Sequence, residues 1–579
     1  MVPPPRHAGH TPSTSSPPSL GYAFSATLYS HRLLDASTLR RLPLGTLPQL
    51  SPCLAPRRRH AWALRPLRRF AGGIVPPPFS LRRAPPLATV APASASASGT
   101  PSDRPPGSHT TVLILGGTGR VGVATAIALI RRSPRPLRLL LGGRSARRGA
   151  AAEAEVAAVG TAVAAAAATV AAAAPNDKEL NSDIPPHSTV VAYTPVDIRD
   201  SASLAAAIAT ADVVLHVAGP FQGSPNPTAV LSAAAAAGVP YVDICDDTDA
   251  AAAVAGMDAV VFRAGGVALI TTGIYPGVSN LLAAAVAERL TAATATATAP
   301  ATATAIATAA ASAPPPSPAH LRYWYYTAGS GGVGRTVLES TFHLLAEPAA
   351  ILVGGEWTTV PPASSPASAD YGGSIGLKEA YALHLPEVAS TAVGLAVSDS
   401  AAAAFGTDPP VWNALLRGVA AVVPPWLLRN TTAMRWAAAV SMPAVRAVDA
   451  LVGGATAMRV AATADDGRGV VAVYRTPTLT EGVGAATAAF VLAVLRSECW
   501  AADAGRPTDA GAAAGRLPRG VVYPEALPPA VRAAVLADAL AGGVAVAEAF
   551  DVVGPPGAAG AAAAATSPPV GGVEGVVPL

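Results

Sequence analysis

Short apolar runs alternate with amphipathic segments between residues 110 and 290, and this rhythm predicts a parallel sheet. Each apolar run is bounded by turn residues, and the next segment carries its apolar side chains at helical spacing. Strands that alternate with helices in this way form βαβ units, which are typical of a doubly wound fold. The expected strands are Val112–Leu115, Leu137–Leu141, Thr189–Val196, Val213–Val217, Tyr241–Cys245 and Gly266–Thr271.

The pattern changes after residue 319, where an aromatic strand at Tyr323–Thr327 precedes a helix that runs through His343. Met458–Thr463 and Val470–Tyr474 flank a short polar turn, and such a pair of alternating segments predicts a β-hairpin. We therefore expect an α/β protein, in which a Rossmann doubly wound parallel sheet is followed by a second α+β substrate domain.

Composition divides the chain into five segments. Tracts of Thr and Ala, or of Gly and Ala, offer few large side chains to bury, so they predict linkers and tails. A charge-free run at Val156–Ala174 is almost all Ala, which favours a surface helix or spacer over a membrane span. The expected segments are a transit or disordered region at 1–105, a Rossmann domain at 109–290 with an insertion at 149–188, a linker at 291–319, a second domain at 320–545 and a disordered tail at 546–579.

Charge is distributed unevenly along the chain. The first 100 residues hold twelve Arg and one acid, Asp35, which gives +11 and leaves 4 − 11 = −7 for the remainder. An Arg-, Ser- and Pro-rich leader without a continuous apolar core is typical of an organelle transit sequence. We expect a plastid destination, with the mitochondrion or an arm that stays attached as alternatives. The acidic remainder does not indicate a nucleic-acid partner. The three cysteines lack C-x-x-C spacing and predict no metal site.

The segment from Thr111 to Gly122 combines a buried strand, a glycine turn and an apolar helix, which is the context a dinucleotide-binding motif needs. Gly117 and Gly119 allow a tight turn and a close approach to a pyrophosphate, while Gly122 allows the helix to pack on the strand. Amide groups at the start of that helix then bind phosphate. The alternative is an ordinary βα turn without a ligand.

The end of the second expected strand bears on the choice between NADP(H) and NAD(H). An NAD enzyme carries an acidic residue there for the ribose 2′-hydroxyl. This chain instead has Arg144 and Ser145, followed by Arg147 and Arg148. Because guanidinium groups bind phosphate through bidentate hydrogen bonds, we expect NADP(H) to be preferred over NAD(H). A solvated Arg cluster at a helix start remains the alternative.

An apolar stripe at Trp412–Leu428 is the most pronounced of the second domain. Core packing or a subunit contact is the favoured interpretation of this stripe, and a subunit contact would make the protein an oligomer. Docking on a membrane surface is the alternative, because Trp and Leu beside Arg417 and Arg429 suit an interfacial helix.

Several motifs taken together resemble one family. They are His216-Val-Ala-Gly-Pro-Phe-Gln222, Tyr241-Val-Asp-Ile-Cys-Asp-Asp247, Tyr275-Pro-Gly-Val-Ser-Asn280, Tyr326-Thr-Ala-Gly-Ser-Gly-Gly-Val-Gly334, Leu385-Pro-Glu-Val388, Glu481–Leu495 and Gly520-Val-Val-Tyr-Pro-Glu525. The chain resembles the saccharopine dehydrogenase-like superfamily over about residues 110–530, and its plastid-targeted plant and algal branch most of all. The insertions at 149–188 and 291–319 depart from the family.

The resemblance implies an NADP(H)-binding domain, a second domain that forms the substrate cleft, and C-terminal helices that pack back on the first domain. By position, Ala218, Gly219 and Pro220 would lie at the nicotinamide ribose, at the carboxyl end of a central strand. The other cofactor residues it implies are Gly116, Gly117, Thr118, Gly119, Arg120, Val121 and Gly122 at the pyrophosphate, Arg144 and Ser145 at the adenosine phosphate, and Asp197 at the adenine.

The catalytic group is less well defined by sequence. Neither Lys178 nor Lys378 has a Tyr four residues before it, which excludes a Tyr-x-x-x-Lys mechanism. Adjacent carboxylates can split their pKa values and keep one proton, although Asp residues at this place also cap helices. A His at the end of a buried strand is also commonly structural. The catalytic candidates are Asp243, Asp246, His216 and Tyr275.

The function expected from the resemblance is hydride transfer between NADP(H) and a small polar substrate of the imine, amino acid or keto acid type in the plastid. The alternative is an NADP(H)-binding protein without turnover that associates with plastid membranes or lipid bodies.

Overall fold

The computed structural model describes residues 109–173, 189–298, 317–329, 334–502, 516–541, 545–553 and 577–578. The chain divides into two units, residues 1–94 and 95–579, and every described residue belongs to the second. The expected transit segment and most of the expected linker and tail lie outside the described residues.

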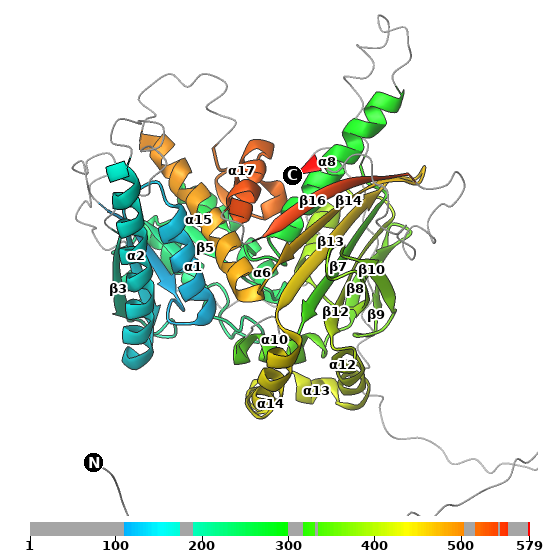
Figure 1. Ribbon diagram of the computed structural model, residues 1–579, viewed down its shortest axis with the longest axis horizontal. Coiled ribbons are helices and arrows are strands. Elements are labelled where there is room, and N and C mark those ends of the chain that lie inside the picture. Colours follow the sequence, from blue (N-terminus) through cyan, green and yellow to red (C-terminus); the bar gives the residue numbers. More distant parts are fainter. Residues whose placement is uncertain are drawn as a thin grey trace, which may run out of the picture. The chain divides into compact units, whose positions relative to one another are not determined.

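The first sheet has seven parallel strands in the order β15-β6-β5-β4-β1-β2-β3. Figure 1 labels β3 and β5 of this sheet and the helices α1 and α2 beside it. Six of the strands follow the 3-2-1-4-5-6 order of a dinucleotide-binding sheet. This confirms the Rossmann part of the predicted fold class. The strands are β1 (Thr110–Leu115), β2 (Leu137–Gly143), β3 (Val190–Pro195), β4 (Val213–His216), β5 (Tyr241–Asp243), β6 (Val267–Leu269) and β15 (Gly520–Val522).

Both faces of this sheet are covered, as the continuous apolar runs predict. Along β1, Val112 and Ile114 pack into one hydrophobic cluster, whereas Leu113 and Leu115 pack into another on the opposite face. The helices of this half are α1 (Arg120–Arg132), α2 (Ala146–Ala173), α4 (Ser201–Ile208), α5 (Ala229–Ala237), α6 (Thr248–Ala255), α7 (Asp258–Arg263) and α8 (Val278–Thr298).

The C-terminal part of the chain returns to the first sheet. Strand β15 pairs with β6, so residues 520–522 lie outside the second domain to which the sequence assigned them. A three-residue strand carries too little periodicity to be recognised. Helices α15 (Leu479–Ala502) and α17 (Pro529–Leu540) contact each other, and α15 also packs on α1.

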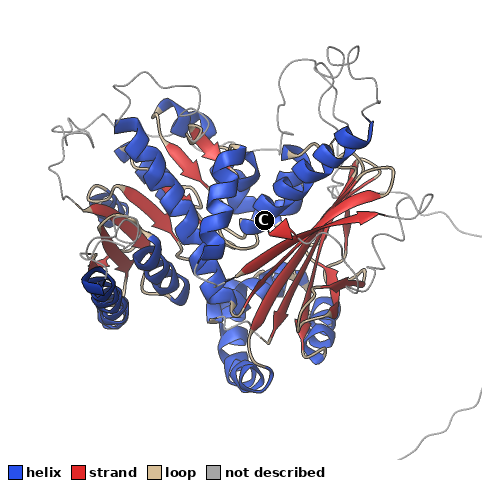
Figure 2. Ribbon diagram, turned by 45° about the horizontal axis from the view of Figure 1, so that its top comes forward, coloured by secondary structure: helices blue, strands red, loops and turns tan. Residues whose placement is uncertain are grey.

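The second sheet is mixed, and Figure 2 shows its strands as a group separate from the parallel sheet. Its order is β10-β11-β12-β7-β13-β14-β16-β17, with the β8–β9 pair attached to β12. The pairing of β12 with β7 is parallel, and β13 and β14 form the predicted antiparallel hairpin. The strands are β7 (His320–Ala328), β8 (Ala349–Val353), β9 (Glu356–Val360), β10 (Ala367–Asp370), β11 (Leu377–Ala382), β12 (Ser400–Asp408), β13 (Ala455–Thr463), β14 (Arg468–Thr476), β16 (Val546–Val553) and β17 (Val577–Pro578).

Strand β16 corrects the expected tail, which was predicted to be disordered from residue 546. It pairs with β14 along its whole length. Val546–Val553 is the last segment with alternating apolar residues before the Gly/Ala tract, so the boundary was placed too early.

Helix α8 links the two halves, because it packs on β13 and β14 while its apolar residues join the core of the first sheet. The remaining helices are α10 (Arg335–Leu344), α11 (Pro386–Gly394), α12 (Val411–Val422), α13 (Pro425–Leu428) and α14 (Thr431–Val452). The expectation that the Trp412–Leu428 stripe is core is wrong for much of its length. Within α12 only Asn413 is fully buried, whereas Val422 is 80% exposed.

Two helices are long and apolar enough to span a membrane by length and composition, at Ala146–Thr169 and Leu479–Ser497. The second is 72% buried by protein, as a core helix would be, and the first is 17% buried. Ala152 and Val156 anchor the start of α2 in the core. The Ala-rich run is therefore a helix, which is one of the two alternatives that the composition favoured.

Candidate functional site

The glycine turn between β1 and α1 has the geometry of a phosphate-binding loop. A Cβ at Gly122 would lie 2.6 Å from the carbonyl oxygen of Gly116 and from Cα of Gly117, so only glycine lets the helix approach the turn. Helix α1 begins after Gly119, which supplies no side-chain cap and has an extended backbone. The amides of the first turn of α1 point out of the helix N-terminus and are suited to bind an anion. These residues fit the pyrophosphate of a dinucleotide.

Thr118 and the second strand form the next part of the cradle. A Cβ at Gly143 would lie 2.7 Å from Oγ1 of Thr118, so the side chain of Thr118 rests on the end of β2. The side chain of Tyr193 on β3 donates a hydrogen bond to the carbonyl of Gly143 at 2.9 Å. The ring of Tyr193 also occupies the space in which a Cβ of Gly149 would lie. Sequence analysis did not identify Tyr193, whose strand is separated from β2 by a long insertion.

The predicted adenosine-phosphate residues follow β2 directly. Arg144 is exposed, and Ser145 lies at the start of α2, where its hydroxyl accepts a hydrogen bond from the amide of Arg148 at 3.4 Å. Asp197 lies beyond β3, and its carboxylate accepts the amide of Arg199 at 3.1 Å. Arg144 is therefore presented to solvent at the carboxyl end of β2, as are Arg147 and Arg148 in the first turn of α2.

The predicted nicotinamide end lies after β4, where Ala218, Gly219 and Pro220 continue from His216. The start of α10 approaches this segment from the second domain. A Cβ at Gly219 would lie 3.7 Å from Cγ2 of Thr336, and one at Gly334 would lie 3.7 Å from Cδ of Arg120. Helix α10 thus borders both the pyrophosphate turn and the nicotinamide end of the predicted site.

Two of the three acids at the carboxyl end of β5 have structural roles. One carboxylate oxygen of Asp243 accepts the amides of Cys245 at 3.0 Å and Thr271 at 2.8 Å, which ties the ends of β5 and β6 together. Asp247 caps α6 by accepting the amide of Ala250 at 2.7 Å. Burial raises the pKa of Asp243 to about 6, although these backbone donors lower it.

Asp246 is the acid of this group that suits proton transfer. It is partly exposed, whereas Asp243 and Asp247 are buried, and the backbone amide that bonds its carboxylate is its own. Burial raises its pKa to about 6, whereas a hydrogen bond from Gln222 lowers it. Gln222 is itself positioned by α10, because Ser340 donates a hydrogen bond to its Oε1 at 2.9 Å. Gln222 ends the sequence motif at 216–222, but no sequence pattern indicated a role for Gln222 or for Ser340.

His216 and Tyr275 differ in accessibility. His216 is buried, its Nδ1 lies 3.1 Å from the hydroxyl of Tyr241, and burial lowers its pKa to about 4, so the ring is neutral near pH 7. Tyr275 is partly exposed and lies 4.8 Å from Tyr325, ring centre to ring centre. Burial and the charge of Glu387 raise the pKa of Tyr275 well above its usual range. Tyr275 can therefore donate a hydrogen bond, and His216 suits a structural role.

A second carboxyl group lies behind Tyr275. Glu387, at the start of α11, is fully buried, and Tyr325 donates a hydrogen bond to its Oε1 at 2.5 Å. Its other oxygen has no hydrogen-bond partner among the described residues. Burial, together with the charges of Glu525 and Asp246, raises the pKa of Glu387 to about 7, although the hydrogen bond from Tyr325 lowers it. Asn280 donates to Glu525 at 2.8 Å, which connects α8 to the segment after β15.

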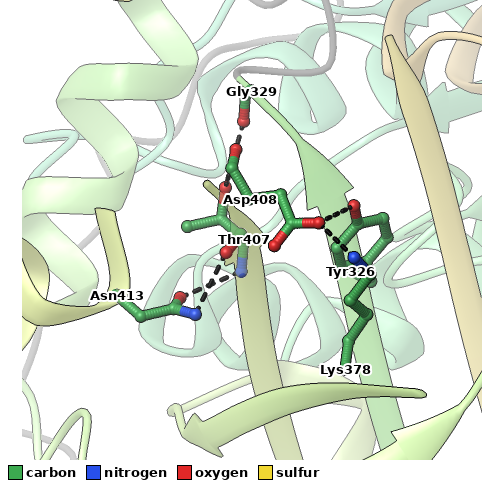
Figure 3. A network of polar contacts seen from close by, with 6 residues as sticks. All are labelled: Tyr326, Gly329, Lys378, Thr407, Asp408 and Asn413. Carbon is green, nitrogen blue, oxygen red and sulfur yellow. Dashed lines mark hydrogen bonds and ion pairs between the residues drawn. The ribbon is translucent and has the colours of Figure 1, made fainter. Parts of the chain in front are cut away.

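A polar network fixes the carboxyl ends of β7 and β12 in the second domain (Figure 3). Asp408 accepts hydrogen bonds from Tyr326 at 2.7 Å and from Lys378. The hydroxyl of Thr407 donates to the carbonyl of Gly329 at 3.1 Å, and Asn413 bonds both backbone groups of Thr407. This network therefore ties the end of β7, through Gly329, to the end of β12.

Residues 112–306 match the model of the saccharopine dehydrogenase NADP binding domain. The chain carries a saccharopine dehydrogenase-like NADP-binding domain. This match bears out the resemblance for the motifs that lie within it, at 216–222, 241–247 and 275–280, and supports a nicotinamide cofactor. The glycine turn and the β4 end both fall inside the matched residues.

Similar solved structures include apo saccharopine dehydrogenase (L-Glu forming) from Saccharomyces cerevisiae, at 11% identity and a TM-score of 0.47, covering 77% of this chain and 100% of that one. They also include homospermidine synthase from Legionella pneumophila in complex with NAD, at 10% identity and a TM-score of 0.40, covering 76% of this chain and 91% of that one. Likenesses this distant assign neither substrate nor reaction. No curated protein matches the sequence significantly.

Proposed function

We propose that this saccharopine dehydrogenase-like chain is an NADP(H)-dependent enzyme that moves hydride to or from a small polar substrate of the imine, amino acid or keto acid type. Its preference for NADP(H) is supported by Arg144, which is exposed at the end of β2, where an NAD enzyme has a carboxylate. Its location in the plastid is supported by the Arg-rich, acid-poor leader.

The observation that carries the proposal is the position and ionisation of Asp246. This carboxyl lies after β5, next in the sheet to β4, after which the nicotinamide end is expected. Open α/β sheets bind ligands beyond the carboxyl ends of their strands. With a pKa of about 6, Asp246 holds a proton in part of its population near neutrality and can transfer it.

When bound, NADP(H) supplies or accepts hydride at the substrate carbon. In the reductive direction Asp246 gives a proton to the nitrogen or oxygen of the double bond, and in the oxidative direction it takes that proton back. The phenol of Tyr275 orients the polar atom by donating a hydrogen bond. Gln222 holds the Asp246 segment, because its Nε2 donates to the backbone carbonyl of Asp246 at 3.5 Å.

The test is NADPH consumption with a panel of keto acids and amines, measured from pH 5 to pH 9. We expect the wild-type rate of reduction to fall as pH rises above about 6, since Asp246 then loses its proton. Asp246→Asn should lower kcat/KM by about 10²–10⁴-fold and remove this pH dependence.

Asp247→Asn is the matched control. Asn caps helices about as well as Asp, so this variant should keep wild-type turnover. An unchanged pH profile in Asp246→Asn would contradict the assigned role. Tight NADPH binding without turnover on any substrate of the panel would favour a cofactor-binding protein that does not catalyse.

A further inference from the structure

The helices α12, α13 and α14 expose an unusual amount of apolar surface. Of the 15 large apolar side chains exposed in the described residues, eight belong to residues 411–452. These eight are Val411, Leu415, Val422, Trp426, Trp436, Val440, Leu451 and Val452. We define them as the α12–α14 apolar surface.

The exposed residues fall on one side of each long helix. Val411, Leu415 and Val422 on α12 are four and seven residues apart, which places them within about 40° of one another around the helix. On α14, Trp436, Val440 and Leu451 are separated by four and eleven residues and share a side in the same way. The opposite sides pack inward, through Leu416 and Ala420 on α12 and through Met434 on α14.

The charge of this segment is opposite to that of the rest of the chain beyond the leader. Residues 411–452 contain Arg417, Arg429, Arg435 and Arg446 against one acid, Asp449, whereas residues 101–579 as a whole carry a net charge of −7. Arg446 is exposed. Exposed Trp and aliphatic residues next to Arg are the composition of a helix that lies in a membrane interface.

We propose that the α12–α14 apolar surface docks on an anionic lipid bilayer, with Trp426 and Trp436 inserted at the headgroup level. Charge argues against two other occupants. A second copy of the surface would bring Arg417, Arg429 and Arg446 against their own equivalents, Arg435 being ion-paired with Glu339, and the leader of this chain carries +11. Anionic lipid headgroups complement the Arg residues, and each Arg near such a surface adds to the attraction. This inference does not depend on the proposed reaction.

The experiment is sedimentation of the full-length protein with vesicles of phosphatidylcholine, with and without phosphatidylglycerol. We expect binding to the anionic vesicles and a blue shift of Trp fluorescence. The double variant Trp426→Ser, Trp436→Ser should bind at least about tenfold more weakly. The matched control is Phe262→Ser, which removes a 58% exposed aromatic ring from α7 and should bind like the wild type.

Arg446→Gln should weaken binding to anionic vesicles by a factor of about five, whereas Arg263→Gln, an exposed cation on α7, should not. The double Trp variant keeps the Arg-rich leader, so wild-type binding by that variant would show that the leader binds and would overturn the proposal. Failure of the wild type to sediment would also overturn it. So would a stable dimer in solution that the Trp substitutions dissociate. Thermal unfolding of each variant reports whether it is folded.

Discussion

The carboxyl ends of β1 and β5 lie in the same parallel sheet, yet they are built in different ways. At the end of β1 the site is made of backbone, and close contacts between Gly116, Gly117 and Gly122 define it. At the end of β5 the site is made of side chains from distant segments, since Asp246 depends on Gln222, which depends on Ser340, 118 residues further along the chain. The first site is specified by neighbouring residues, and the second exists only after the second domain has folded.

The largest effect is expected from a substitution in the glycine turn at the end of β1. Gly122→Ala would put a Cβ 2.6 Å from backbone atoms of the turn, so α1 must move away from β1. We expect NADPH binding, measured by cofactor fluorescence, to weaken by at least about 100-fold, since phosphate contacts depend on this approach.

Gly160→Ala is the control for that change. Gly160 lies within α2, and the nearest atom to its Cβ would be Cδ1 of Ile130 at an ordinary 3.8 Å. This variant should bind NADPH as the wild type does and gain up to about 1 kcal/mol in stability, because Ala favours a helix over Gly. Equal binding by both Gly variants would show that the glycine turn is not the cofactor site.

The buried carboxyl of Glu387 can be tested through the pH dependence of stability. The pKa of Glu387 is raised to about 7, above its ordinary value of 4.5, so between these values the folded protein keeps a proton that the unfolded chain releases. The free energy of unfolding should therefore fall as pH rises from about 4.5 to 7. Glu387→Gln should reduce this slope by up to about 1.4 kcal/mol per pH unit.

Urea unfolding at several pH values measures the slope, and Glu356→Gln, at an exposed position on β9, provides the comparison. The exposed variant should follow the wild-type curve. If Glu387→Gln does the same, the buried carboxyl does not titrate in this range and the raised pKa assigned to it is wrong.

The same contrast explains what sequence could predict. The six strands β1 to β6, their parallel arrangement and the glycine turn follow from local periodicity and glycine spacing, and they were predicted. Strand β15 and the contacts of Gln222, Ser340 and Glu387 join segments far apart in sequence, which no local pattern encodes. Asp243 and Asp247 have the same side chain as Asp246, and their backbone hydrogen bonds distinguish them only in the folded chain.

The α12–α14 apolar surface gives a further example. Helical spacing showed that Trp412–Leu428 has an apolar side, but it could not show which side faces the core. The structure buries Leu428 and leaves Trp426 70% exposed, although they are two residues apart. Helical periodicity shows that a helix has an apolar side, but only tertiary packing decides what covers that side.

The central claim is that the β1 and β2 ends bind NADP(H), and a direct test is calorimetric titration of the full-length protein with NADPH and with NADH. We expect NADPH to bind at least about tenfold more tightly, and Arg144→Ala to remove most of this difference while leaving NADH binding unchanged, because its guanidinium would contact only the 2′-phosphate. Arg263→Ala, on α7, should leave both affinities unchanged. Equal affinities for the two cofactors in the wild type, or binding of neither, would contradict the account.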